Sequence, residues 1–206
     1  MLQRTSWLVI AAAACIAGIA GYWLARELDR SAPQLASGTW LAQARVLPDF
    51  QLEDQHGQPF TLQSLRGKPS LLFFGFTHCP DVCPTTLFKL AQVKKAAALP
   101  GLQIALISVD PQRDTPQALA AYVRSFDPDF IGATGTPEQI RKVSTDFGVA
   151  TQRVDLPGGD YTMDHTAAVF LTDRQGHIAA VFTPPFDSRT LVQDLRKAAP
   201  FLGASS

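Results

Sequence analysis

The sequence has no excess of charge of either sign, because Lys and Arg together number 18 and Asp and Glu also number 18. Proteins that bind a nucleic-acid backbone carry a surplus of basic residues, so this balance gives no support to a nucleic-acid-binding surface. There is no internal repeat, and no low-complexity segment apart from alanines near the amino terminus. With 46% hydrophobic residues over 206 positions, the chain can bury the core of one ordinary domain plus an appendage.

Cysteine is scarce, with only three residues in the chain. Cys15 lies in an apolar amino-terminal stretch, and we interpret it as a small apolar residue of that stretch. Cys79 and Cys83 are then the only thiols in the rest of the chain. A disulfide between them would close a very short loop and so contribute little stability, which favours a functional pair over a structural one.

Residues 7–25 contain no charged side chain. Nineteen helical residues span about 28 Å, close to the hydrocarbon thickness of a bilayer. Trp7 at one end and Trp23 near the other suit the two membrane interfaces. We therefore predict a transmembrane anchor over residues 7–25.

The anchor has a predicted orientation, with residues 1–6 in the cytoplasm, because Arg4 and the amino terminus are positive. A cleaved signal peptide and lipoprotein processing at Cys15 are the alternatives. The apolar run continues for ten residues beyond Cys15, which favours a retained span. The amino terminus has no Arg- and Ser-rich presequence, so we expect a bacterial inner membrane with the soluble domain in the periplasm.

The remaining chain has the pattern of one α/β domain. Residues 26–46 lack periodicity and predict a linker, and residues 47–206 predict the folded domain. The domain's pattern predicts a leading β-hairpin over 50–62, strands over 70–76, 103–109, 130–133, 167–172 and 178–182, and helices over 85–98, 117–126, 136–147 and 188–199. This order is that of a thioredoxin-like fold with an added N-terminal hairpin.

Residues 77–84, THCPDVCP, lie between an expected buried strand and an expected helix. Free N–H groups and the helix dipole favour thiolate at such a helix start. If Cys83 lies on the first turn, its i, i+4 relation to Cys79 can direct both sulfurs to one place. Thiolate is both a nucleophile and a soft metal ligand, so the motif alone leaves redox and metal chemistry open.

Several motifs in the same order give the chain a specific resemblance to a known family. They are CPDVCP at 79–84, FGFTHCP at 74–80, SVDPQRDTP at 108–116 and DHT at 164–166. The chain resembles the Sco/SenC family over about residues 47–201. These are thioredoxin-fold, membrane-anchored copper proteins that help to assemble the CuA site of cytochrome c oxidase. The resemblance implies that Cys79, Cys83 and His165 are the metal ligands.

The residue types support this assignment. Two thiolates and one imidazole make a soft, three-coordinate site suited to Cu(I), whereas zinc prefers a fourth ligand for which the sequence offers no obvious residue. Related redox folds carry a cis-proline facing the thiols, but residues 161–168 contain no proline. His165 in that region favours metal binding over disulfide exchange.

Other residues near these motifs have open or structural interpretations. Asp164 is either a partner that orients His165 or an ordinary exposed carboxylate. His78 could adjust the thiolate of Cys79, and Met163 is expected to pack. His56 and His177 are expected to be solvated in turns, and the aspartates of the 110–116 stretch are expected to turn and cap the chain.

The leading hypothesis is a metallochaperone, not an enzyme, that binds Cu(I), with Cu(II) as a second oxidation state. It would deliver copper to the oxidase subunit that carries CuA, and another copper chaperone or a thioredoxin-like reductant would serve it. The alternative is a thiol–disulfide oxidoreductase in which Cys79 and Cys83 are the redox pair, reducing the oxidase subunit or another extracytoplasmic partner. A peroxidase is disfavoured because Phe76 stands where peroxidases carry Thr or Ser.

Overall fold

The structure, a computed structural model, describes residues 14–23 and 32–203. The chain divides into two compact units, with the boundary in the sequence after Ala32. In the first unit, residues 14–23 are helical. Over the two described ranges, no helix is both long and apolar enough to cross a bilayer. The predicted anchor at 7–25 extends beyond the described residues at both ends, and the predicted cytoplasmic segment 1–6 lies wholly outside them.

The second unit is built on an eight-stranded mixed sheet with strand order β1-β10-β9-β4-β5-β6-β2-β3, and a separate two-stranded sheet, β7-β8. The strands are β1 Gly38–Arg45, β2 Gln51–Asp54, β3 Pro59–Thr61, β4 Ser70–Gly75, β5 Gln103–Ser108, β6 Ile131–Thr134, β7 Thr151–Asp155, β8 Tyr161–His165, β9 Val169–Thr172 and β10 Ile178–Phe182. The helices are α2 Leu62–Leu65, α3 Val82–Ala97, α4 Pro116–Arg124, α5 Pro137–Phe147, α6 Ser188–Ala198 and the 3-10 turn η1 Ala199–Phe201.

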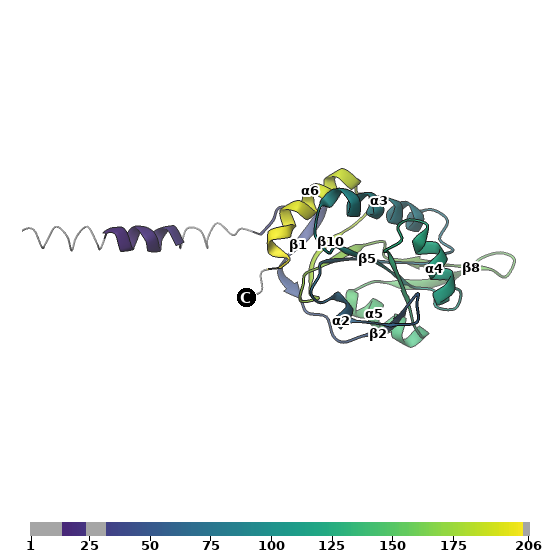
Figure 1. Cartoon of the computed structure of the whole chain (residues 1–206). Coiled ribbons are helices and arrows are strands. Elements are labelled where there is room, and N and C mark those ends of the chain that lie inside the picture. The colour runs from purple at the N-terminus through teal and green to yellow at the C-terminus, as the bar shows by residue number, and fades with distance from the viewer. Residues whose placement is uncertain (1–13, 24–31, 204–206) are drawn as a thin grey trace, which may run out of the picture. The chain divides into compact units, whose positions relative to one another are not determined.

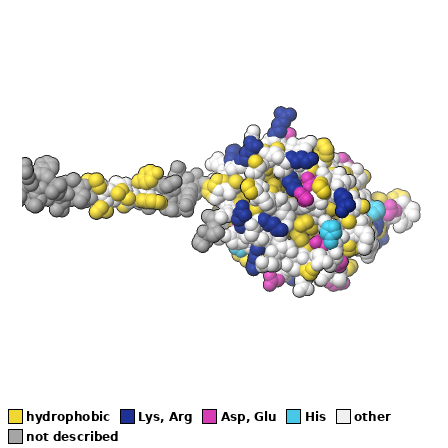
Figure 2. Space-filling view, viewed as in Figure 1, with side chains coloured by type: hydrophobic (Ala, Val, Ile, Leu, Met, Phe, Trp, Pro, Cys, Tyr) yellow, Lys and Arg dark blue, Asp and Glu magenta, His cyan; other side chains and the backbone are white. Residues whose placement is uncertain are grey.

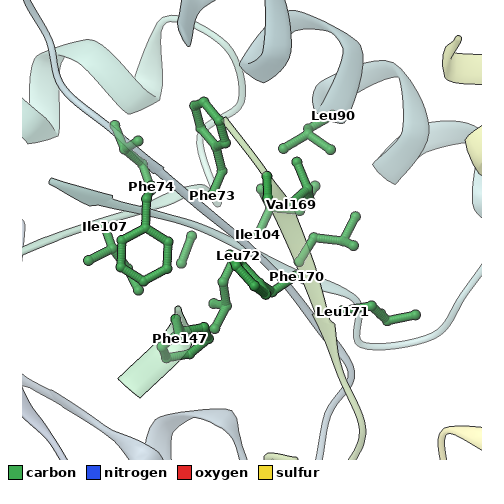
Figure 3. Close-up of a cluster of buried hydrophobic side chains, with 14 of the residues drawn as sticks. Leu72, Phe73, Phe74, Leu90, Ile104, Ile107, Phe147, Val169, Phe170 and Leu171 are labelled. Carbon is green, nitrogen blue, oxygen red and sulfur yellow. The ribbon is translucent and has the colours of Figure 1, made fainter. Parts of the chain in front are cut away.

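The centre of the sheet is covered on both faces. Strands β4 and β5 are parallel, and all six residues of each are buried, which explains why both segments are almost wholly apolar. Figure 1 shows α3 and α6 along one face and α5 on the other. Below the sheet, Phe74, Phe147 and Phe170 pack with ring centroids 5.1–5.9 Å apart, as Figure 3 shows. The thioredoxin-like α/β order with a leading β2–β3 hairpin is as predicted.

The predicted linker differs from the structure in its second half. Gly38–Arg45 form β1, which pairs antiparallel with β10 at the edge of the sheet. Most of β1 is exposed, so it carries no hydrophobic period from which a strand could be predicted. Its position depends on distant groups, because buried Asp194 accepts hydrogen bonds from the backbone N–H of Ala36 and of Ser37 at 2.8 and 2.7 Å. The folded domain therefore begins before residue 47.

The surface agrees with the balanced charge of the chain. On the face of the domain in Figure 2, side chains of both signs are scattered among polar and apolar ones. This face shows no extended basic stripe of the kind that tracks a phosphate backbone.

Candidate metal centre

The two thiols meet where β4 ends and α3 begins. Cys79 lies in the loop and is half-buried, and Cys83 lies in the first turn of α3 with no exposed surface. Both are free thiols, and the backbone N–H of Cys83 donates to Cys79 Sγ at 3.3 Å. A Cβ on Gly75 would lie 3.0 Å from Cys83 Sγ, so glycine at the end of β4 gives the sulfur its space.

His165, at the end of β8, reaches this pair from 82 residues away. Its Nε2 lies 3.6 Å from Cys83 Sγ, and its Nδ1 lies 3.3 Å from the carbonyl oxygen of Thr166. A carbonyl only accepts, so this contact assigns a proton to Nδ1 and turns Nε2 toward the sulfurs. The rings of Phe73 and Phe76 meet the imidazole edge to face at 6.2 and 5.9 Å and form apolar walls around it.

The pKa values of the two thiols are shifted in opposite directions. The hydrogen bond from the Cys83 thiol lowers the pKa of Cys79 to about 4, against the effect of partial burial, with further contributions from His165 and backbone N–H groups. The same hydrogen bond, followed by burial, raises the pKa of Cys83 well above its ordinary value. The pair therefore holds one proton near neutral pH, with Cys79 as thiolate and Cys83 as thiol.

Asp114 supports the loop that carries Cys79. Its carboxylate is fully buried and accepts from the Thr77 hydroxyl at 2.6 Å, from the Thr77 N–H at 3.1 Å and from the Ser108 hydroxyl at 2.6 Å. Sequence reasoning gave Asp114 only a turn or capping role, and the α4 cap is in fact Thr115. One signal was available: β4 and β5 are adjacent parallel strands, so the loops that follow them leave the same edge of the sheet.

The structure does not bring the other predicted candidates to the sulfurs as ligands. Asp164 is exposed, and His165 Nδ1 contacts the carbonyl oxygen of Thr166 instead. The side chain of His78 is 54% exposed, with Nδ1 3.0 Å from the Thr77 hydroxyl. Met163 packs against the core, as expected, and His177 lies 3.6 Å from Asp173.

The side chains proposed as ligands, Cys79, Cys83 and His165, lie close together as hydrogen-bond partners. Within the two described ranges, no group of three or more His, Cys, Asp or Glu side chains is already arranged to hold a metal ion. The contact from Cys83 Sγ to His165 Nε2 is nevertheless of suitable length. Metal–ligand bonds of about 2.3 Å to sulfur and 2.0 Å to nitrogen would hold these atoms about 3.7 Å apart in a trigonal site. Two sulfurs and one imidazole also suit a soft ion.

Comparison with known proteins decides the family. The SCO1/SenC family pattern matches residues 39–200. The chain belongs to the SCO1/SenC family. The match begins within β1, in agreement with the earlier start of the domain.

Individual relatives extend over most of the chain. The bovine protein named "Protein SCO2 homolog, mitochondrial", from Bos taurus, is 37% identical over 193 residues, which are 88% of this chain and 71% of the relative. The structure of Bradyrhizobium japonicum ScoI with copper bound is 44% identical, covers 74% of this chain and 98% of its own, and superposes with a TM-score of 0.68.

A more distant structure shares the fold. BsSco, described as a member of the Sco family of cytochrome c oxidase assembly proteins and as containing a disulfide switch, is 22% identical with a TM-score of 0.61. The match covers 79% of this chain and 98% of that one. This SCO1/SenC protein thus has the same thioredoxin-like α/β fold as these structures.

Proposed function

We propose that this protein is a copper metallochaperone that binds copper through Cys79, Cys83 and His165. The observation that carries the proposal is the approach of His165 Nε2 to within 3.6 Å of Cys83 Sγ across 82 residues of sequence. The copper-bound structure of the Bradyrhizobium relative supports copper as the ion. The acceptor we propose is the oxidase subunit that carries the CuA site.

Copper is the cargo, and the protein's own groups govern its binding. Cys79 is already a thiolate near neutral pH, but Cys83 must release its proton because only the thiolate binds a soft ion well. Loading therefore releases about one proton from the thiol pair. Half-buried Cys79 is the accessible sulfur, so we expect acceptor ligands to approach on that side and replace the chaperone's ligands one at a time.

The proposed location follows from the amino-terminal sequence. Residues 7–25 would anchor the protein in a bacterial inner membrane, with the folded domain in the periplasm. That compartment is oxidising, and a Cys79–Cys83 disulfide cannot bind copper. The proposal therefore includes a thioredoxin-like reductant for the thiols and a second copper chaperone as donor.

A thiol–disulfide oxidoreductase is the second candidate, favoured by one observation. The lowered pKa of half-buried Cys79 makes it a thiolate nucleophile, with the Cys83 thiol adjacent to resolve a mixed disulfide. In this mechanism the Cys79 thiolate attacks a partner disulfide to form a mixed disulfide and displaces one partner thiol. Cys83 then attacks Cys79 Sγ and displaces the second partner thiol, so the partner is reduced and a Cys79–Cys83 disulfide forms. His165 has no required part in these steps.

The test is an anaerobic Cu(I) titration of the reduced full-length chain in detergent against a competing chelator. We expect about one copper per chain, and binding weaker by about 100-fold or more in His165→Ala, since even partners that only orient a ligand are worth about 10- to 100-fold. His177→Ala, which lies in a turn with Asp173, is the matched control and should bind as the wild type does.

A disulfide-reduction assay on the same variants separates the two candidates. Copper binding that does not change in His165→Ala, together with full reductase activity that requires Cys79, would replace the chaperone proposal by the oxidoreductase.

A further inference from the structure

Arg113 is a main contact between the hairpin that carries His165 and the rest of the domain. Figure 1 shows the β7–β8 turn projecting from the body of the domain. Arg113, in the loop between β5 and α4, donates from Nη1 to the carbonyl oxygen of Tyr161 at 2.9 Å and to Asp160 at 3.3 Å. Its guanidinium also stacks on the Tyr161 ring, 3.7 Å from the centroid. Only 18% of the Arg113 side chain is exposed.

Tyr161 is held from three directions. The guanidinium groups of Arg113 and Arg153 both stack on its ring, with their central carbons 3.7 and 3.8 Å from the centroid. The Tyr161 hydroxyl donates to Asp110 at 2.8 Å. Asp110 is buried and also accepts from Arg113 Nε at 2.5 Å, so the guanidinium and the phenol share one carboxylate. A planar cation that is stacked and hydrogen-bonded on two edges has little freedom to move.

We call the contacts of Arg113 and Asp110 with Tyr161 the clasp. Tyr161 and His165 lie on the same side of strand β8. Side chains alternate along a strand, so Tyr161, Met163 and His165 point the same way, while Asp164 points out to solvent. Met163 packs against the core between the other two. Fixing Tyr161 therefore fixes the register and facing of β8, and with them the direction of His165.

The same loop supports the sulfur side of the site. Residues 110–114 bind the hairpin through Asp110 and Arg113, and they bind Thr77, two residues before Cys79, through Asp114. One short segment thus connects both halves of a site whose residues are far apart in sequence. The hydrogen-bond contacts of the two sulfurs are with the Cys83 N–H and with His165 and not with residues 110–114, so the effect of residues 110–114 on the site is one of position.

We propose that Arg113 and Tyr161 act as positioning residues that hold His165 over Cys79 and Cys83. This inference rests on the proposed copper function. A chain with an open clasp binds through the sulfurs alone, so the apparent dissociation constant rises as the fraction of chains with His165 in place falls. The largest possible loss is therefore the loss caused by His165→Ala itself.

Two variants test the clasp in full-length, reduced protein. Arg113→Ala removes the stack and the bonds to the Tyr161 carbonyl and to Asp110, and we expect Cu(I) binding about 10- to 100-fold weaker. Tyr161→Phe keeps the ring and removes only the bond to Asp110, so a loss of less than about tenfold is expected. Arg124→Ala, at the exposed end of α4, is the matched control and should bind as the wild type does.

A double substitution separates positioning from general damage. In the His165→Ala background, Arg113→Ala should cause no further loss of copper affinity, because the residue acts through His165. The Cu(II) spectrum should change in the same direction in Arg113→Ala as in His165→Ala. Additive losses in the double variant, or a wild-type spectrum in Arg113→Ala, would overturn the proposal.

A measurement on the copper-free chain distinguishes failure of the clasp from failure of the copper function. Amide hydrogen exchange in residues 161–165 should be faster in Arg113→Ala, by about tenfold or more, while exchange in β4 and β5 stays unchanged. Unchanged exchange in β8 overturns the clasp even if copper binds normally. Faster exchange in β8 of a chain that does not bind copper would refute only the copper function.

Discussion

Asp114 offers a sharp test of how the Cys79 loop is held. Its buried carboxylate is the common acceptor for three donors, which are the Thr77 hydroxyl, the Thr77 N–H and the Ser108 hydroxyl. Asp114→Ala leaves all three without that acceptor. A buried donor left unpaired costs about 1–3 kcal/mol. Thr77 is partly exposed and can reach water, so the expected loss in the free energy of unfolding is about 3–5 kcal/mol.

Asp114→Asn should be much milder, because the network can be satisfied without the charge. The amide oxygen can accept from the Thr77 N–H and from Ser108, while the amide NH2 donates to the Thr77 hydroxyl, which accepts as well as it donates. Only the strengthening that comes from charge is lost, and charge-assisted bonds are about twice as strong as neutral ones. We expect a loss of about 1–2 kcal/mol.

Urea unfolding of the two variants and the wild type, followed by circular dichroism, measures the difference. Asp129→Ala is the matched control, since that carboxylate is 79% exposed and pairs with Lys94 at the surface, so its removal should cost less than about 1 kcal/mol. Alkylation of Cys79 in the folded protein should also change in Asp114→Ala, because the loop that carries it is released. If Asp114→Ala is no more destabilising than Asp114→Asn, the three hydrogen bonds to Asp114 do not hold the loop.

Two further outcomes follow from the same contacts. With a Cys79 pKa of about 4, alkylation of Cys79 in the reduced, copper-free chain should be nearly independent of pH above about 5. In Cys83→Ala, the pKa of Cys79 should move back toward 9.0, so the alkylation rate should rise with pH. A wild-type rate that climbs tenfold per pH unit to about pH 8 would refute this. Phe147→Ala, which empties a site between Phe74 and Phe170, should lower the free energy of unfolding by about 3–5 kcal/mol in urea, and a loss below about 1 kcal/mol would contradict the packing in Figure 3.

Local signals in the sequence were enough to predict most of the fold. The apolar runs of β4 and β5 are buried on both faces, and α4, predicted over 117–126, spans Pro116–Arg124. Strand β1 could not be predicted, because its residues are mostly exposed and its pairing with β10 joins the two ends of the domain. Pairing of that kind is specified by the partner strand and not by the strand's own pattern.

The candidate site, like the fold, could be predicted from the sequence only in part. The strand–loop–helix pattern predicted that Cys79 and Cys83 would lie close together, and chain order predicted that His165 would precede a later strand of the sheet. The supports around them depend on contacts between distant segments. Arg113 and Asp114 look like ordinary turn residues in sequence, and their roles appear only when β8 and the Cys79 loop are both placed against them. That His165 is a ligand stays a prediction.

The most direct measurement of the central claim is X-ray absorption at the copper edge on the Cu(I)-loaded full-length chain, compared with His165→Ala. The account predicts two sulfur neighbours and one nitrogen neighbour around the metal in the wild type, with the nitrogen lost and both sulfurs kept in the variant. Copper that is bound by sulfur alone in the wild type, or a nitrogen neighbour that persists in His165→Ala, would contradict it.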